Sequence, residues 1–333
     1  MAGDKDRITI NILPVRNGDC LHLRFYSSRE WKNIVIDSGP SGASGTFRLL
    51  LEQIQAHDEY IDLLCFSHSD DDHIKAAERV LSTDNFDAAR IRRVWINLPP
   101  NLSPAVSIDS TYRPETVVTA CGLWNALCRH SIPCITHIKA GMETFIGDAH
   151  IHVVLPYQER LVSFYNEWEK QCKQLNYHPV SPQQDTSPFN GSSITLLCTI
   201  GNERILLCGD AFSSDLTDVG QQYAGDTGFS LVKLPHHGSE ANITQLMLSS
   251  LKCTNFIISG RETLYRPAPT TMDLLNSYGA TVDSLTVFGN YQWPRFSSGF
   301  SNLKIVFPDT RIVLLNEKIE VCADASSSKP FTQ

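Results

Sequence analysis

The chain has 333 residues, of which 42% are hydrophobic, so it is long and apolar enough for one large domain or two ordinary ones. Its 36 acidic residues outnumber its 28 basic ones, and the formal net charge is −8 at pH 7. This balance argues against a general nucleic-acid coat, and any anionic substrate would have to bind through local positive charge or a metal.

The ten cysteines contain no C-x-x-C pair, and several lie inside apolar, strand-like runs such as ITLLCTI. Buried, reduced thiols of this kind are typical of a cytosolic protein. The N-terminal MAGDKDRITI lacks the pattern of a signal peptide, and no apolar run reaches the roughly 18 residues of a membrane span. We therefore expect a cytoplasmic protein without a membrane segment.

The first half of the chain alternates between strand-like and helix-like segments. Strands are predicted from apolar runs bounded by Gly-containing breaks, and helices from apolar residues at helical spacing. The second predicted helix begins near His73. The predicted strands cover 8–15, 21–27, 33–39, 61–67, 90–99, 134–140 and 150–156, and the helices 44–57, 73–80 and 114–131.

The second half repeats this logic, with strand-like runs from 192 to 316 separated by helices. The class is therefore α/β, and we expect a four-layer sandwich with helices outside two face-packed sheets. We expect one domain over residues 1–320, interrupted at about 157–190 by an aromatic-rich insertion containing one helix and a lid-like loop. Residues 321–333 look like a flexible tail.

The stretch HSDDDH, residues 68–73, follows the apolar run IDLLCFS directly. Three neighbouring carboxylates repel one another and lose solvation when partly buried, so the arrangement is costly unless a cation neutralises it. A metal site is the first hypothesis. The alternative is an acidic first helical turn, which the helix dipole favours.

Polar residues follow strand-like runs in five separate segments, and strand ends converge on one edge of a sheet. Alternation within the 68–73 segment lets His68 and Asp70 face one centre while Asp72 and His73 face a second. Asp210 is then the natural bridging carboxylate. The five segments are Asp37, His68 to His73, Asn190 with Ser193, Asp210, and the pair His236-His237.

This pattern resembles the metallo-β-lactamase fold, whose signature is H-x-H-x-D-H followed by a later His, a bridging Asp and a final His. The variant H-x-D-x-D-H is similar to the cytoplasmic hydrolase domain of the bacterial competence DNA-uptake channel. The matching segments, in the same order, are Asn17-Gly18-Asp19, Ile36-Asp37-Ser38-Gly39, His68 to His73, Asn190 to Ser193, Gly209-Asp210 and His236 to Ser239. The resemblance spans about residues 8–290.

The resemblance implies two metal sites that share Asp210. Asp37 would hydrogen-bond a metal-binding histidine and fix its tautomer, and Asp71 would point away. One of the two histidines at 236 and 237 would bind the second metal, and His236 is favoured because it directly follows the strand. His237 would then support a ligand from behind or face the substrate. The implied ligands are His68, Asp70 and Asp210 for one metal, and Asp72, His73, Asp210 and His236 for the other.

Three positions depart from the family pattern. Asp70 replaces the usual second His, which makes this site richer in oxygen and favours manganese or magnesium over zinc. The usual third-segment His is replaced by Asn190, unless His152 substitutes for it. The late Tyr-x-His-Pro segment reads Tyr265-Arg266-Pro267.

The resemblance implies a metal-dependent hydrolase that uses two divalent ions, Zn or Mn, and a metal-bridged hydroxide. Asp72 would orient the attacking water or receive its proton, with His237 beside it. An oxygen-rich binuclear site suits a phosphodiester, so we expect a phosphodiesterase or nuclease acting on nucleic acid or a nucleotide. The alternatives are hydrolysis of a lactone, thioester or amide, and a degenerate module that binds a protein partner within a multi-gene system.

Overall fold

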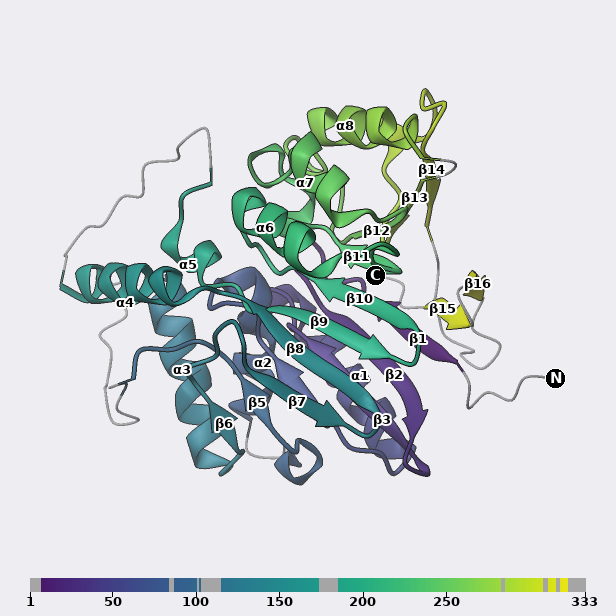
Figure 1. Cartoon of the computed structure of the whole chain (residues 1–333). Helices are drawn as coiled ribbons and strands as arrows, with labels where there is room; N and C mark the ends of the chain where they lie inside the picture. Colours follow the sequence, from purple (N-terminus) through teal and green to yellow (C-terminus); the bar gives the residue numbers. More distant parts are fainter. Residues whose placement is uncertain are drawn as a thin grey trace.

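The protein is described here from a computed structural model of the whole chain (Figure 1). The structure describes residues 7–83, 87–100, 102, 115–173, 185–282, 285–307, 311–315 and 318–322. Its strands form two eight-stranded sheets.

The first sheet is built mainly from the N-terminal half of the chain. Its strand order is β16-β15-β1-β2-β3-β4-β5-β6, and β3 to β6 run parallel to one another. The carboxyl ends of these four strands therefore lie at one edge. The strands are β1 (Ile8–Ile12), β2 (Leu21–Ser27), β3 (Glu30–Ile36), β4 (Leu63–Cys65), β5 (Val94–Trp95), β6 (Cys134–Ile135), β15 (Arg311–Leu315) and β16 (Lys318–Cys322).

The second sheet continues the chain in the order β14-β13-β12-β11-β10-β9-β8-β7. Strands β10 to β14 are parallel, so this sheet also gathers strand carboxyl ends at one edge. The strands are β7 (Glu143–Ile146), β8 (Ala149–Leu155), β9 (Thr195–Ile200), β10 (Glu203–Leu207), β11 (Leu231–Lys233), β12 (Asn255–Ile258), β13 (Thr286–Gly289) and β14 (Lys304–Val306).

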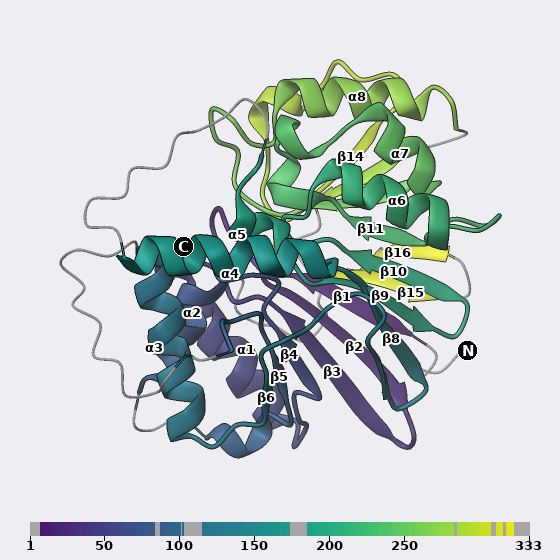
Figure 2. The ribbon, with the colours of Figure 1, turned by 60° about the vertical axis from the view of Figure 1, so that its left-hand side comes forward.

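Helices cover the outer face of each sheet, as Figures 1 and 2 show. One apolar core fills the space between the sheets. A second core lies between the first sheet and its helices, and a third between the second sheet and its helices. The first sheet is covered by α1 (Ser44–Ala56), α2 (Asp71–Leu81), α3 (Glu115–Arg129), α4 (Gln158–Lys173) and α5 (Pro188–Gly191), and the second by α6 (Ser213–Tyr223), α7 (Gln245–Leu251) and α8 (Pro269–Gly279). The predicted four-layer α/β sandwich is confirmed.

Helix α2 begins two residues earlier than the apolar spacing predicts, at Asp71 instead of near His73. Asp70 is the extended residue before it, and Asp71 and Asp72 fill its first turn. Carboxylates are favoured there by the helix dipole, which the periodicity of apolar residues does not report. Part of the acidic segment is thus a helix N-terminus, as the alternative interpretation expects.

Three other segments predicted from the sequence lie partly outside the residues that the structure describes. The insertion contains α4, Asp185 and α5, while its lid-like part at 174–184 lies outside the described residues. Most of the loop at 99–114 lies outside them too. Strand β16 includes residues 321 and 322 of the predicted tail. No helix in the described ranges is long and apolar enough to cross a membrane.

Candidate metal centre

The polar segments predicted from strand ends do meet at one edge of the two sheets. Asp37 directly follows β3, and His68 lies three residues beyond the end of β4. In the facing sheet, Asp210 follows β10 and the pair His236-His237 follows β11. Since parallel strands bring their carboxyl ends together, segments far apart in sequence converge here.

Close packing of backbone positions Asp210. Its neighbour Gly209 has a φ of +56°, and a Cβ at this glycine would lie 2.8 Å from the Cβ of Ser67. Only glycine accepts both the left-handed backbone and this approach without strain. The Asp210 backbone N–H donates to Ser193 Oγ at 3.1 Å, which ties the carboxylate to the start of β9.

Three site residues adopt left-handed backbone that non-glycine residues rarely adopt. The φ angles are +61° at Asp37, +50° at His236 and +54° at His237. Such conformations cost on the order of 1–3 kcal/mol each and persist where the surrounding structure fixes them. At the histidine pair, the consecutive left-handed residues let both imidazoles reach Asp210.

The Oδ2 atom of Asp210 lies at the centre of four imidazoles. It is 3.5 Å from the Nε2 atoms of His73 and His236 and 4.0 Å from those of His68 and His237. These separations are longer than hydrogen bonds and leave the nitrogens facing one oxygen. A carboxylate in this position can share ions with the surrounding nitrogens.

Several buried polar atoms here have no hydrogen-bond partner among the described residues. They include Nε2 of His68, His73 and His237 and Oδ1 of Asp210. Burying such atoms without partners costs free energy, so a native protein rarely leaves several together. Imidazole nitrogens and carboxylate oxygens are the donors that divalent transition metals take, and the residues present therefore fit such ions.

Hydrogen bonds behind the centre fix two of the imidazoles. Asp37 Oδ2 lies 2.9 Å from His73 Nδ1, which directs His73 Nε2 at the centre, as expected from the sequence. The Asp37 carboxylate also accepts from the Ser67 backbone N–H at 2.7 Å. His236 Nδ1 lies 2.8 Å from Asn242 Oδ1 and 3.1 Å from Asp185 Oδ2.

Asp185 is a site residue that the strand-end argument misses, because it lies in the insertion and follows no strand. It accepts from the Nδ2 groups of Asn190 at 2.8 Å and Asn242 at 2.9 Å. Burial raises the pKa of Asp185, but the hydrogen bonds from His236, Asn190 and Asn242 hold the net pKa below its usual value. A charged Asp185 therefore orients His236.

The pairs expected within the 68–73 segment lie together. His68 Nε2 is 3.6 Å from Asp70 Oδ2, and His73 Nε2 is 3.7 Å from Asp72 Oδ1. The Asp70 and Asp72 side chains are 32% and 35% exposed, whereas both histidines are fully buried. The two carboxylates thus form the solvent-facing side of the centre.

The two histidines of the PHHG turn take different places. His237 is 2% exposed, and its Nε2 lies 3.3 Å from Asp72 Oδ2, next to the expected second centre. Ligand atoms of Asp19, His73, Asp210 and His237 all lie within 4.8 Å of one another. His236 is 14% exposed and contacts the Arg266 guanidinium through Nε2. The geometry thus makes His237 a ligand candidate alongside His236.

Asp19 and Lys233 form a buried ion pair beside this group. Lys233 Nζ contacts Asp19 Oδ2, donates to the Gly209 carbonyl at 2.9 Å and lies 3.9 Å from Asp210 Oδ1. His237 Nδ1 is 3.3 Å from Asp19 Oδ1. The only sequence signal is the Asn17-Gly18-Asp19 turn, where a Cβ on Gly18 would meet the Asp72 carbonyl oxygen at 2.0 Å.

Charges in the centre shift its pKa values strongly. Burial lowers the pKa of His237, but Asp19, Asp210 and Asp72 outweigh it and raise the pKa to about 9. Burial also lowers the pKa of His73, but the nearby carboxylates outweigh it and raise this pKa. Burial raises the pKa of Asp210, but the nearby imidazoles outweigh it and lower this pKa. The carboxylates thus favour cations, whether protons or metals, on these imidazoles.

Three other residues singled out from the sequence lie outside this group of ligand atoms. Asp71 points away, as expected, and burial raises its pKa to about 6 against the opposing contacts with Thr119 and Lys75. Asn190 is buried, and its side-chain amide donates to Asp185. His152 on β8 contacts His150 of the same strand and Tyr223 at the end of α6, and no contact joins it to the cluster among the described residues.

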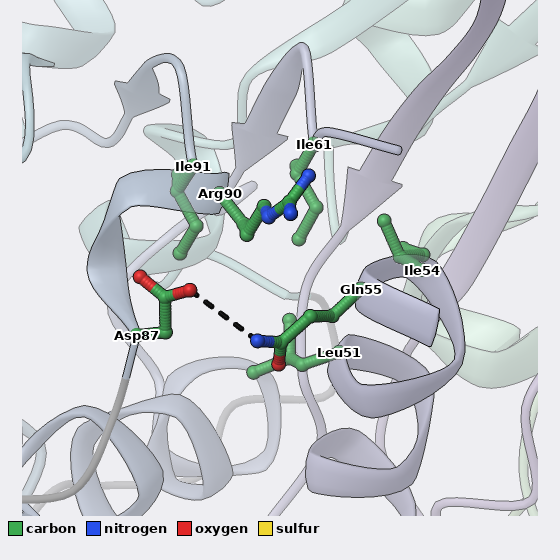
Figure 3. Close-up of a pocket in the computed structure, with 7 residues that line it drawn as sticks. All are labelled: Leu51, Ile54, Gln55, Ile61, Asp87, Arg90 and Ile91. Carbon is green, nitrogen blue, oxygen red and sulfur yellow. Dashed lines mark hydrogen bonds between the residues drawn. The ribbon is translucent and has the colours of Figure 1, made fainter. Parts of the chain in front are cut away.

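A small pocket lies at the other end of the first sheet, between the end of α1 and the segments that precede β4 and β5 (Figure 3). Gln55 donates to Asp87 across it at 3.3 Å. Its lining is mostly apolar and includes none of the residues around Asp210.

Comparison with known proteins finds one family model that matches part of the chain. Residues 28–118 match the model of the metallo-beta-lactamase superfamily, a range that includes the 68–73 segment and ends before Asp210. With the four-layer architecture, the chain has a metallo-β-lactamase-type fold. Members of that superfamily are mostly metal-dependent hydrolases. The predicted relation of this chain to competence proteins stays a prediction. The comparison with curated proteins found no match.

Solved structures similar to this chain include the metallo-beta-lactamase fold protein YhfI from Bacillus subtilis, with 10% identity and a TM-score of 0.46 over 86% of this chain and 96% of that one. CmlA, a diiron beta-hydroxylase from Streptomyces venezuelae, is 11% identical with a TM-score of 0.48, covering 94% of this chain and 55% of CmlA. A diphosphatase from the PhnP family is 11% identical with a TM-score of 0.42, covering 96% and 99%.

Proposed function

We propose that this protein is a metal-dependent hydrolase that cleaves phosphodiesters at the centre around Asp210. One observation carries the proposal: four imidazole Nε2 atoms surround Asp210 Oδ2 at 3.5–4.0 Å, and three of them are buried with no hydrogen-bond partner among the described residues. The four-layer fold and the superfamily match support it.

The proposed ligands fall on two sides of Asp210. His68 and Asp70 would hold one divalent ion with Asp210, and Asp72 and His73 would hold the other. The resemblance assigns His236 to this second ion, but His237 Nε2 lies 3.3 Å from Asp72 Oδ2, so we add His237 to that set, with His236 reaching Asp210 through Nε2. Bound there, two divalent ions would neutralise charge that develops on the ester and lower the pKa of a water molecule. The carboxylates favour Mn and the imidazoles also suit Zn, so we propose one of these two ions for this mixed set of oxygen and nitrogen ligands.

The protein's own groups would position the reactants and move the proton. Asp37 and Asp185 orient His73 and His236 through their Nδ1 atoms. Asp72 is the exposed carboxylate beside His237, so we assign it to orient the attacking water and receive its proton. The buried Lys233 offsets the charge of Asp19, which keeps that carboxylate ionised behind the centre.

A phosphodiester fits this centre better than a neutral ester, because its two non-bridging oxygens carry charge that a pair of cations can bind. The net charge of −8 favours a small or single-stranded phosphodiester over a duplex. Nine of the ten cysteines are free thiols in the structure, which supports the proposed cytoplasmic location.

Hydrolysis of a bis-aryl phosphodiester in the presence of manganese tests the proposal. Both Asp72→Ala and His68→Ala are expected to lower kcat by about 100-fold or more, the usual effect of losing a catalytic proton acceptor or a metal ligand. His152→Ala removes a histidine outside the centre and should leave the rate unchanged. Turnover of a lactone without turnover of the diester would replace the proposed chemistry, and no turnover of any ester would favour a binding module.

A further inference from the structure

The loop between β12 and α8 brings an arginine to the edge of the centre. The Nη2 atom of Arg266 contacts His236 Nε2, the nitrogen that lies 3.5 Å from Asp210 Oδ2. The loop is held by a turn in which the Thr263 backbone N–H donates to the Arg266 carbonyl at 2.7 Å and Thr263 Oγ1 accepts from the Arg266 N–H at 2.9 Å. Arg266 is thus anchored at its backbone.

The tautomer of His236 determines whether its Nε2 accepts a hydrogen bond from Arg266. Nδ1 faces two acceptors, Asn242 Oδ1 and Asp185 Oδ2, so it carries the hydrogen. Nε2 then has a lone pair that accepts from the Arg266 guanidinium. If His236 Nε2 binds a metal instead, Arg266 loses this acceptor.

Arg266 has no carboxylate within ion-pair distance among the described residues, whereas three other cations of the chain do. Lys233 pairs with Asp19, Arg160 with Asp215 and Arg295 with Glu262. An unpaired guanidinium beside a carboxylate-rich centre is a site for an anion.

The position of the loop leaves Arg266 open to a ligand from solvent. The preceding Leu264 and Tyr265 are 73% and 75% exposed, and Arg266 itself is half-buried. Arg266 is therefore partly exposed while its guanidinium contacts His236 at the edge of the centre.

We propose that Arg266 binds the phosphate group of the substrate, moving its donors from His236 Nε2 to non-bridging phosphate oxygens. This inference rests on the proposed function, since it assigns the substrate of that centre as a phosphate anion. A guanidinium presents parallel N–H donors that match two phosphate oxygens, whereas a neutral ester offers no charge for them. Arg266 thereby selects anionic over neutral esters.

Titration calorimetry with inorganic phosphate on manganese-loaded protein tests this without turnover. Arg266→Gln should weaken phosphate binding by about 10- to 100-fold, the usual effect of losing a charge-assisted hydrogen bond. Arg266→Lys keeps the charge but not the paired donors and should fall between. The matched control is Arg261→Gln, because Arg261 is an exposed arginine on the same loop that stacks on Tyr291 at 5.2 Å.

Each contrary outcome is distinct. Equal phosphate affinity in wild type and Arg266→Gln overturns the proposal, with or without bound manganese. Equal losses in Arg266→Gln and Arg261→Gln also overturn it, since the effect would then be one of overall charge. A fall in manganese content of Arg266→Gln alone would make Arg266 a support of the metal site instead. Absence of ester hydrolysis with an intact difference in phosphate affinity would refute the proposed function and leave this inference standing.

Discussion

The two ends of strand β4 collect buried charge in opposite ways. Before the strand, Asp62 accepts from Arg92 at 2.6 Å and from the Asn33 backbone N–H at 2.9 Å, and Lys32 lies 3.7 Å away. After the strand, the buried Nε2 of His68 has no hydrogen-bond partner in the described part of the chain, and the carboxylates of Asp70 and Asp210 lie 3.6 and 4.0 Å from it. The first end is satisfied by the protein alone.

The difference separates a structural network from a binding centre. Each buried charge before β4 meets an opposite charge or a hydrogen bond, as when Glu59 accepts from Arg24 at 2.9 Å and Asn33 at 3.0 Å. Around Asp210 the imidazole nitrogens lie 3.5–4.0 Å from the carboxylate oxygen, and a bound cation is needed to join them. Completeness of hydrogen bonding, more than the number of charges, distinguishes the two ends.

Removing the central charge should have the largest effect. Asp210→Asn preserves shape but removes the shared carboxylate, so we expect loss of bound metal and a fall in phosphodiester hydrolysis of about 100-fold or more. Elemental analysis and initial rates measure both. Retained metal at the wild-type stoichiometry would contradict the central place given to Asp210.

Removing a charge before β4 should act on stability alone. Asp62→Ala leaves Lys32 and Arg92 without their shared carboxylate. We expect a loss of about 2 kcal/mol in the free energy of unfolding, less than a fully buried pair because the Arg92 side chain is 39% exposed. Urea unfolding of metal-free protein gives the value. A change in the metal content of this variant would contradict the assignment of a purely structural role to the charges before β4.

The smallest effect is expected at Asp71, which adjoins the centre but points away from it. Burial raises its pKa from 3.8 to about 6, so the ionised carboxylate destabilises the folded state at pH 7 and above. Asp71→Asn should therefore raise the free energy of unfolding there by less than about 1 kcal/mol, given solvent screening. The gain should shrink as the pH falls through 6 and vanish below 3.8.

The rate of hydrolysis is the control for Asp71. An unchanged rate in Asp71→Asn beside a large loss in Asp72→Ala would sharpen the contrast between neighbouring carboxylates. A large loss in both would place Asp71 in the centre and contradict its position on α2.

The sequence predicts the layers and most of the centre because both depend on where strands end. Asp37, His68 and Asp210 each follow an apolar run, and parallel strands then bring them together. The start of α2 is less predictable, since its first turn is acidic and carries no apolar periodicity.

Other parts of the centre depend on contacts that no local pattern encodes. Asp19 and Asp185 lie in a turn and an insertion, and only tertiary packing brings them to His237 and His236. The choice between the two adjacent histidines depends on left-handed backbone at both, which residue types alone do not predict.

Anomalous diffraction from crystals grown with manganese would test the central claim most directly. We expect two manganese peaks flanking the Asp210 carboxylate, each with histidine Nε2 atoms among its ligands. An ordered centre without a manganese peak, its imidazoles bound only to water, protons or protein groups, would contradict the account.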